Sequence, residues 1–297
     1  MYTCLDLNNE EKLKELAEKG DASAQYLYGN KCLHRQWQES NDPRKEGEYW
    51  LTKAAEQEYI PAQLALADSY LYQFQKNLNI YAYKLNLLMK LGKGESLDSK
   101  SSSPIDMTDY SKSLYWYLQA AEREDGKALF CVGWFYETGK GGVKEDFQKA
   151  LEYYIKSANS GYVPAQVVLG QCYATGNIIN KDLPKSIYWY RRAAEQGELR
   201  AQNIMGVCAT CGIGMEKNIS LAVSWFMSAA RQGNPDAQKN LAHMYEYGIG
   251  VDLDTGKATF WNHQTERDKF KISDDTSPIF EYHKDLECMV HLPKNLT

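Results

Sequence analysis

Small and large apolar residues recur along this chain at helical spacing. In the segment PAQVVLGQCYATG (164–176), Ala165, Leu169, Gly170 and Tyr173 fall at i, i+4, i+5 and i+8, on one side of a helix with 3.6 residues per turn. Alanine and glycine at a contact let two helix axes approach closely, and the aromatic residue one turn later fills the space beside them. The pattern therefore predicts a helix that packs tightly along one face.

A second apolar block follows each copy of the first. In SIYWYRRAAEQG (186–197), the large pair Trp189 and Tyr190 and the small pair Ala193 and Ala194 supply the matching large and small positions. This spacing is also helical, so the two blocks together predict a pair of packed helices.

The ends of the expected helices carry capping residues. Glycines close the second blocks where a left-handed C-cap is expected: Gly161, Gly197 and Gly233. Short polar residues stand where the next helix needs an N-cap: Asp146, Asp182 and Asn218. The helix boundaries are thus specified locally.

The first block is an internal repeat. It recurs as RAQNIMGVCATCG (200–212) and DAQKNLAHMYEYG (236–248), with looser copies upstream. The anchoring alanines are Ala24, Ala62, Ala128, Ala165, Ala201 and Ala237, so the last three steps are 37, 36 and 36 residues. A fixed period in this range is typical of stacked supersecondary units, each contacting its neighbours.

These motifs resemble the Sel1-like repeat proteins, relatives of the tetratricopeptide repeats. The resemblance rests on the AQxxLG block, on YWYxxAAEQG (188–197), and on the loops GIGV (248–251) and GKGGV (139–143), and it covers about residues 12–268 in six copies. Departures from the pattern are Ala67 and Ala242 for the glycine, and Cys32 and Ala209 for the tyrosine. The resemblance implies an all-α, right-handed α/α superhelical solenoid of about six helix pairs, and a role in assembling or regulating other proteins, mainly in bacteria.

The repeat pattern divides the chain into a solenoid over 1–268 and a non-repeat tail over 269–297, which we expect to cap the end of the stack. An insertion at about 73–108 interrupts the second repeat. Its first half has helical spacing and is expected to prolong the preceding helix, and its serine-rich half (93–104) is expected to be a mobile loop. The insertion is either an arm that grips a partner or a tolerated surface insertion, since long loops cost little.

Composition excludes several classes of protein. Of the 297 residues, 43% are hydrophobic and 25% are charged, as in a folded protein. The net charge of -5 and the absence of a basic run argue against a nucleic-acid partner. No segment reads as a secretory signal or a membrane span, and seven scattered cysteines favour free thiols in a reducing compartment. The chain is therefore expected to be cytoplasmic, although a periplasmic protein whose signal peptide was removed would look the same.

Candidate chemical motifs have structural explanations. Cys208 and Cys211 have CxxC spacing, but they fall inside an expected helix without a second pair, so Cys208 is interpreted as a packing residue. The GKGG segment (139–142) lacks the spacing of a phosphate loop and reads as an inter-helix loop. The five histidines show no metal-binding spacing such as HExxH. We therefore expect no catalytic residues, no cofactor and no metal.

The first helix of each pair offers a candidate partner-binding face. If positions 0, +4, +5 and +8 from the anchoring alanine face inward, positions +2, +3, +6 and +10 face the other way and, by analogy with related solenoids, line a concave groove. These positions hold Tyr26, Leu27, Asn30, Phe130, Trp134, Thr138, Val167, Val168, Gln171, Asn203, Ile204, Val207, Lys239, His243 and Tyr247. Aromatic and aliphatic side chains on an exposed face are typical of binding hot spots. The alternative is that adjacent repeats or the tail cover them.

Three hypotheses of function follow. The first is a non-enzymatic scaffold or adaptor that binds a partner protein through the groove and through the insertion at 73–108. The second, from the resemblance, is a bacterial immunity protein that neutralises a cognate secreted toxin by direct binding. The third is an enzyme of unrecognised type, which would need a pocket with converging polar groups.

Overall fold

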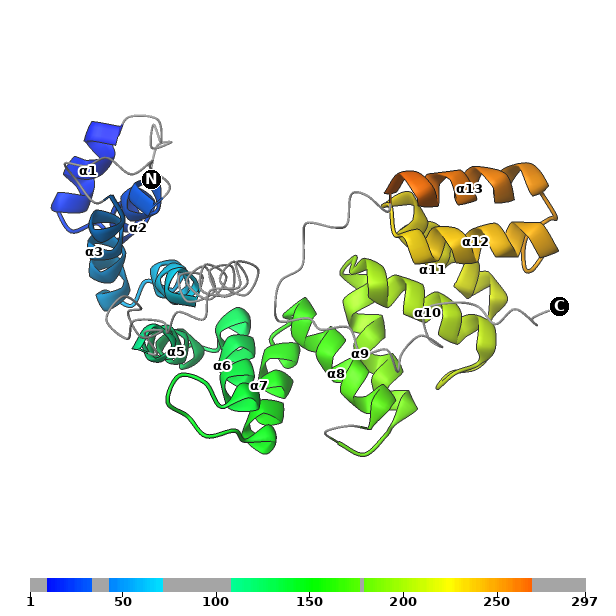
Figure 1. Ribbon diagram of the computed structural model, residues 1–297, viewed down its shortest axis with the longest axis horizontal. Helices are drawn as coiled ribbons and strands as arrows, with labels where there is room; N and C mark the ends of the chain where they lie inside the picture. Colours follow the sequence, from blue (N-terminus) through cyan, green and yellow to red (C-terminus); the bar gives the residue numbers. More distant parts are fainter. Residues whose placement is uncertain (1–9, 34–42, 72–107, 177–178, 269–297) are drawn as a thin grey trace, which may run out of the picture. The chain divides into compact units, whose positions relative to one another are not determined.

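The computed structural model describes residues 10–33, 43–71, 108–176 and 179–268, and every regular element in these ranges is a helix (Figure 1). The chain forms two compact units, residues 1–156 and 157–297. The expected insertion at 73–108 lies almost wholly outside the described residues, and so does the tail at 269–297. The predictions of a prolonged helix, a mobile loop and an end cap therefore stay predictions.

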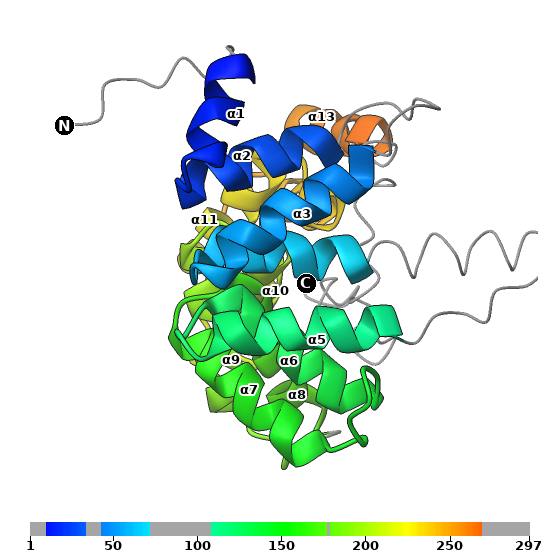
Figure 2. The same cartoon turned by 90° about the vertical axis from the view of Figure 1, so that its left-hand side faces the viewer.

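Helices of the first unit follow one another in pairs (Figure 2). Their bounds are α1 (Glu10–Glu18), α2 (Ala22–Leu33), α3 (Pro43–Glu56), α5 (Thr108–Ala121), α6 (Gly126–Thr138) and α7 (Phe147–Asn159), the last of which runs into the second unit. Residues 60–71, between α3 and α5 in the chain, are also helical. The helix α2 packs on α3, and α5 packs on α6.

The second unit continues with three complete helix pairs. Their bounds are α8 (Val163–Thr175), α9 (Leu183–Glu195), α10 (Leu199–Cys211), α11 (Ile219–Arg231), α12 (Pro235–Tyr247) and α13 (Thr255–Asp268). Each helix packs on the next, as Figure 1 shows for α12 and α13. The prediction of an all-α array of helix pairs is confirmed. We call α2, residues 60–71, α6, α8, α10 and α12 the A helices, and their successors α3, α5, α7, α9, α11 and α13 the B helices.

Close contact between a glycine and an aromatic ring joins the two helices of a pair. A Cβ atom added to Gly170 would lie 2.9 Å from the ring of Tyr190, and one added to Gly206 would lie 2.5 Å from the ring of Phe226. Tyr190 and Phe226 are at most 1% exposed. The predicted meeting of small residues on the A helix with large residues on the B helix is confirmed, because only glycine leaves room for these rings.

The predicted caps are also confirmed. Gly161, Gly197 and Gly233 have φ angles of 97°, 91° and 92°, in the left-handed region that favours glycine. At the helix starts, the side chains of Asp146, Asp182 and Asn218 accept hydrogen bonds from the backbone N–H groups of Lys149, Lys185 and Leu221. Each cap satisfies a backbone donor that the first helical turn leaves unpaired.

At two junctions of the first unit, glutamates take the place of the closing glycine, which is kept after α1 as Gly20. Glu58 and Glu124 align with Gly197 in the repeat and have φ angles of 63° and 61°. A side chain in this region costs about 1–2 kcal/mol relative to ordinary helical backbone. Glu58 also accepts an ion-pair hydrogen bond from Arg123, which ties the two junctions of this unit together.

A line of buried side-chain amides connects the repeats of the second unit. Gln166, Gln202 and Gln238 each follow an anchoring alanine, and their Nε2 groups donate to the carbonyl oxygens of Ala158, Ala194 and Ala230 at 3.2, 3.1 and 3.1 Å. Each such bond holds an A helix against the end of the preceding B helix.

The same glutamines also bond to the following B helix. Gln196 donates to Oε1 of Gln166 at 2.8 Å, and Gln232 donates to Oε1 of Gln202 at 3.4 Å. We call these residues, Gln166, Gln196, Gln202, Gln232 and Gln238, the glutamine ladder. The ladder ends at Asp268, whose Oδ2 accepts from Gln238 at 2.9 Å. Because a carboxylate cannot return a hydrogen bond, Oε1 of Gln238 has no partner.

Candidate protein-binding face

The candidate site consists of the A-helix positions +2, +3, +6 and +10, and α12 shows them most openly. Lys239 and Tyr247 are exposed, Tyr247 by 49%, and His243 is partly exposed between them. The rings of His243 and Tyr247 have their centroids 4.6 Å apart. These residues are spaced at i, i+4 and i+8, so the three side chains form one line along the helix.

On α8 and α2 the predicted residues are half-buried. Val167, Val168 and Gln171 of α8 each keep part of their surface in solvent. In the first unit, Tyr26, Leu27 and Asn30 of α2 do the same. The ring of Tyr26 lies 5.5 Å from that of Tyr59, and Leu27 packs on the cluster around Leu13. Each of these side chains is therefore partly packed against its neighbours and partly exposed to solvent.

The prediction that positions +2, +3 and +6 of α10 face solvent is wrong. Asn203, Ile204 and Val207 are 2%, 6% and 0% exposed. Asn203 accepts a hydrogen bond from Asn240 of α12 at 2.9 Å, so neighbouring A helices pack against one another here. The alternative, that adjacent repeats cover the stripe, therefore holds for Asn203.

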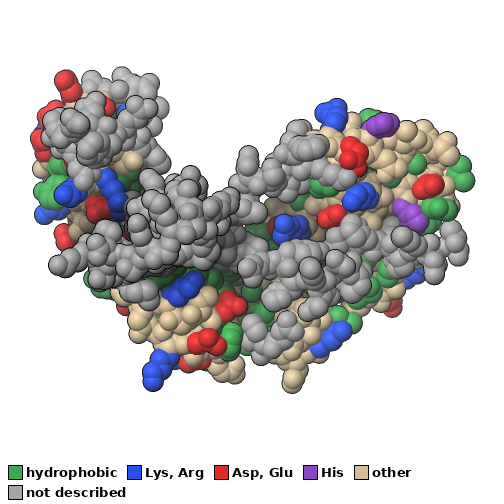
Figure 3. Space-filling view, in the orientation of Figure 1, with side chains coloured by type: hydrophobic (Ala, Val, Ile, Leu, Met, Phe, Trp, Pro, Cys, Tyr) green, Lys and Arg blue, Asp and Glu red, His purple; other side chains and the backbone are tan. Residues whose placement is uncertain are grey.

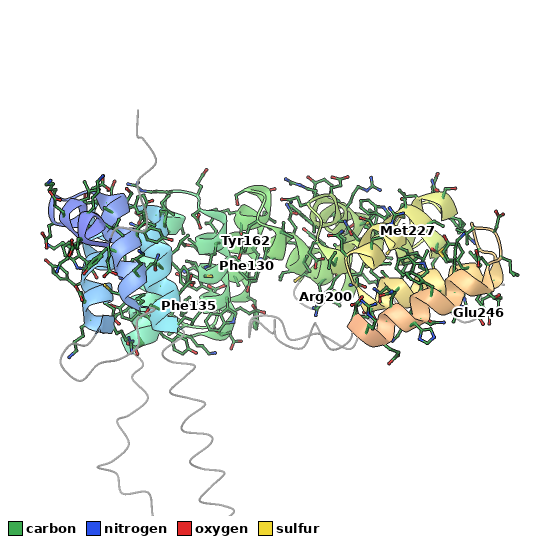
Figure 4. All side chains as sticks on the ribbon, turned by 90° about the horizontal axis from the view of Figure 1, so that it is seen from above. Phe130, Phe135, Tyr162, Arg200, Met227 and Glu246 are labelled. Atoms are coloured by element: carbon green, nitrogen blue, oxygen red, sulfur yellow. The ribbon has the colours of Figure 1, made fainter. Side chains whose placement is uncertain are left out.

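The prediction for Phe130 is wrong as well. This residue of α6 is 2% exposed, and its ring centroid lies 5.2 Å from that of Tyr154 on α7 (Figure 4). A Cβ atom on Gly133 would lie 2.7 Å from the ring of Tyr154, so that ring lies close against α6, where it covers Phe130. Trp134 and Thr138, further along α6, stay partly exposed, and Thr138 donates its hydroxyl to the carbonyl of Trp134 at 2.8 Å.

A set of exposed rings on the B helices was missed by the sequence analysis. Tyr49, Tyr115, Tyr188 and Phe260 are 51–54% exposed, and each precedes a tryptophan whose ring it meets edge to face at 5.0–5.1 Å. They occupy the same position on four B helices. The aromatic residue that repeatedly precedes a tryptophan in the second block was the available signal, but the sequence analysis considered only Trp189 and Tyr190 in that block and assigned them to packing.

Charge does not single out a patch on the visible part of the first unit. In Figure 3, its positive and negative side chains are interspersed. In the second unit, lysines in the first turns of B helices lie over tyrosine rings of the preceding A helices. Lys185 lies 5.4 Å from the ring centroid of Tyr173 and pairs with Asp182 at 3.0 Å. Lys257 lies 5.1 Å from the ring centroid of Tyr245 and pairs with Asp254 at 3.1 Å.

Most cysteines of the described ranges are buried. Cys208 is 0% exposed within α10, which confirms its packing role, and Cys211 is partly exposed at the end of that helix. Burial raises the pKa of the Cys131 thiol to about 12, and that of the Cys32 thiol to about 11. These thiols are neutral at physiological pH and are poor nucleophiles.

Nothing in the described ranges brings together three or more histidine, cysteine, aspartate or glutamate side chains in a way that could hold a metal ion. No helix among the described residues has the length and apolar character needed to cross a membrane. The GKGG segment forms the loop after α6, and Gly139, Gly141 and Gly142 in it have positive φ angles. This loop is the inter-helix connection that the sequence predicted.

A repeated helix pair, with its A helix packed against the preceding and the following B helix, defines an α-solenoid of about six repeats. The model of the Sel1 repeat matches residues 22–59, 106–125, 126–162, 163–198, 199–234 and 235–261. The chain belongs to the Sel1 repeat family. A search of curated proteins gives no significant match.

Solved structures share the fold. One is c5321, a protective antigen of uropathogenic Escherichia coli strains with an SLR fold, which is 28% identical over 87% of this chain and 48% of its own, with a TM-score of 0.67. The chain thus spans about half the length of that protein. A Sel1 repeat protein from Oxalobacter formigenes is 25% identical over 86% of this chain and 90% of its own, with a TM-score of 0.58. The immunity protein Pa5087 from Pseudomonas aeruginosa matches at 19% identity over 68% and 81% of the two chains, with a TM-score of 0.31, which is too low to carry an argument.

Proposed function

We propose that this protein is a non-enzymatic scaffold that binds a partner protein through the exposed side of its A helices. The observation that carries the proposal is the line of Lys239, His243 and Tyr247 on α12. The exposed ring of Tyr247 is of a side-chain type that contributes most at protein interfaces, and the imidazole and the ammonium group in line with it add polar contacts beside that ring. The half-buried residues of α8 and α2 extend the same set of positions in their own repeats.

Membership of the Sel1 repeat family supports a scaffold over an enzyme. The described residues have packing or capping roles wherever the sequence offered candidate chemistry, as for Cys208 and Asp182. Stacked helix pairs present extended surfaces, and such surfaces bind other proteins by the variable side chains at their exposed positions.

Site-specific photo-crosslinking in the native organism tests the proposal. A photoreactive phenylalanine derivative at position 247 is expected to capture one predominant protein, identified by mass spectrometry. The matched control carries the same derivative at position 260, because Phe260 is exposed by 51% but lies on a B helix of the same repeat. The proposal fails if position 247 captures no protein, or if both positions capture the same set.

A triple variant, Lys239→Ala, His243→Ala and Tyr247→Ala, gives the complementary measurement. It is expected to remain helical by circular dichroism and to lose the captured protein in a pull-down. Variants of Phe130 are unsuitable for this purpose because Phe130 is buried and its removal would loosen α6. If the captured protein is a secreted toxin whose activity the wild type suppresses, the scaffold acts as an immunity protein.

A further inference from the structure

Lys140, in the loop after α6, lies between two aromatic rings of the first unit. Its Nζ is 4.6 Å from the ring centroid of Trp134 and 5.4 Å from that of Tyr110. The two rings are themselves 6.1 Å apart, and Phe135 packs edge to face against both. The ammonium group is thus held on an aromatic platform built from α5 and α6.

Backbone contacts fix the position of this lysine. Its N–H donates to the carbonyl of Phe135 at 3.2 Å, directly after the left-handed cap at Gly139. Gly141 follows with a φ angle of 71°, and a Cβ atom there would lie 3.1 Å from the side chain of Leu114 and from the carbonyl of Tyr110. The loop is therefore held closely against the first turns of α5.

Comparison of the repeats shows that a charged residue directly after the capping glycine of an A helix is unusual within the chain. Lys140 follows the capping glycine of α6, and the residues that follow the capping glycines of α10 and α12 are Ile213 and Ile249. Both isoleucines pack against hydrophobic clusters. Two other repeats fill this position with an apolar side chain and the repeat of α8 has Asn177, so lysine here is the charged exception; it costs desolvation free energy, and such local departures concentrate at functional sites.

Lys140 also lacks an anionic partner in the described part of the chain. Lys112, Lys185 and Lys257 lie over tyrosine rings too, but each pairs with an aspartate, at 4.0, 3.0 and 3.1 Å. No ion pair joins Lys140 to a residue of the described ranges, and burial lowers the pKa of its ammonium group. A partly desolvated cation binds an incoming anion more strongly than a fully hydrated one does.

We infer that Lys140, framed by Trp134 and Tyr110, is an anchor site for a carboxylate of the partner protein, in an acidic segment that lies along α6. This inference rests on the proposed function and names the chemistry of the partner. Trp134 belongs to the predicted A-helix face at position +6, so the anchor continues that face. The fixed ammonium supplies the charge, and the exposed part of Trp134 supplies apolar surface beside it.

Titration with short peptides tests the anchor directly. The lysines of the full-length protein are ¹³C-dimethylated, which keeps their charge, and the Lys140 resonance is assigned by its loss in Lys140→Ile. We expect that resonance to lie upfield because of the two rings, and to shift on addition of acetyl-hexaglutamate amide but not of acetyl-hexaglutamine amide. The Lys140→Ile variant is expected to bind hexaglutamate at least about tenfold more weakly, by calorimetry at low salt.

Lys149→Ile is the matched control, because Lys149 lies 5.2 Å from the ring centroid of Tyr136 in the same unit and is exposed. It is expected to bind hexaglutamate as the wild type does, and Lys140→Ile is expected to melt at the same temperature as the wild type or higher. The anchor is ruled out if the wild type does not bind hexaglutamate, or if Lys140→Ile binds it equally well. If Lys140→Ile retains the partner that crosslinks to position 247 with unchanged affinity, the scaffold proposal stands and the anchor falls. If position 247 captures no partner but Lys140 still binds hexaglutamate, the carboxylate site stands and the scaffold proposal falls.

Discussion

Gly206 of α10 and Phe226 of α11 lie so close that a Cβ atom on the glycine would be 2.5 Å from the phenylalanine ring. Phe226 is fully buried, so it cannot move aside without opening the core. Gly206→Ala is therefore expected to lower the free energy of unfolding by about 1–3 kcal/mol, although alanine is the better helix former. Urea unfolding followed by circular dichroism measures the loss.

A second substitution separates the clash from a general loss of packing. Phe226→Leu alone should destabilise the protein, but in the Gly206→Ala background its cost should be smaller, because leucine leaves room for the added methyl group. Strict additivity of the two substitutions would contradict the close contact.

Gln202 of α10 bonds to the preceding repeat through the carbonyl of Ala194 and to the B helix of its own repeat through Gln232. Gln202→Leu keeps most of the volume and removes the side-chain donor to the carbonyl of Ala194, which keeps its backbone bond from Gly197 at 3.0 Å, so a loss of about 1–1.5 kcal/mol is expected. Gln232→Ala removes the 3.4 Å bond to Gln202 and a 3.1 Å bond to the carbonyl of Ser228, both from an exposed side chain, and should cost under about 1 kcal/mol. Equal losses in the two variants would show that the ladder does not contribute as described.

Glu124 has a φ angle of 61° at a position where later repeats have glycine. Glu124→Gly is expected to raise the free energy of unfolding by roughly 1 kcal/mol, because glycine adopts the left-handed conformation without the clash of a Cβ atom. The reverse change at the equivalent place, Gly197→Glu, should lower it by a similar amount. Thermal melts of both variants check the prediction, and a lower melting temperature for Glu124→Gly would refute it.

Cys131 gives a pH-dependent prediction. Burial raises the pKa of its thiol from 9.0 to about 12, so the folded state favours the neutral form. The stabilising contribution is complete below pH 9 and is lost as the pH rises from about 9 to 12, since only the unfolded thiol ionises in that window. Cys131→Ala should flatten this decline in stability.

Alkylation offers an independent measurement on the same thiol. At about pH 8, iodoacetamide should modify Cys131 in urea but not in the folded protein, as read by peptide mass spectrometry. Rapid modification of Cys131 without denaturant would show that the thiol is neither buried nor neutral.

The helices and their ends could be predicted because their determinants are local. The spacing of Ala165, Leu169 and Gly170 fixes which side of an A helix faces its partners, and Asp182 and Gly197 mark boundaries through bonds that span only a few residues. A repeated sequence also supplies several independent readings of the same pattern. For these reasons the array of helix pairs followed from the sequence.

Exposure on the A-helix face could not be predicted with equal success. The exposure of position +2 to solvent depends on how closely the next A helix approaches. Asn203, for example, accepts a hydrogen bond from Asn240, which lies a whole repeat away in the sequence. Phe130 is buried by Tyr154 of the following B helix, although the equivalent position on α8 stays half-exposed as Val167. The glutamine ladder escaped notice because its partners are 30 residues apart, as in Gln166 and Gln196. Lys140 could have been found by comparing its position with Ile213 and Ile249.

The last turn of α13 has a consequence for growth of the array. The A helix α10 docks on α9 beside the small pair Ala193 and Ala194, whereas α13 has Thr265 and Glu266 at the equivalent positions and Asp268 in place of the amide of Gln196. A further A helix placed on α13 would meet the larger side chains of Thr265 and Glu266 where α9 and α11 carry alanine pairs. Lengthening the array by design at α13 would therefore first require the substitutions Thr265→Ala and Glu266→Ala.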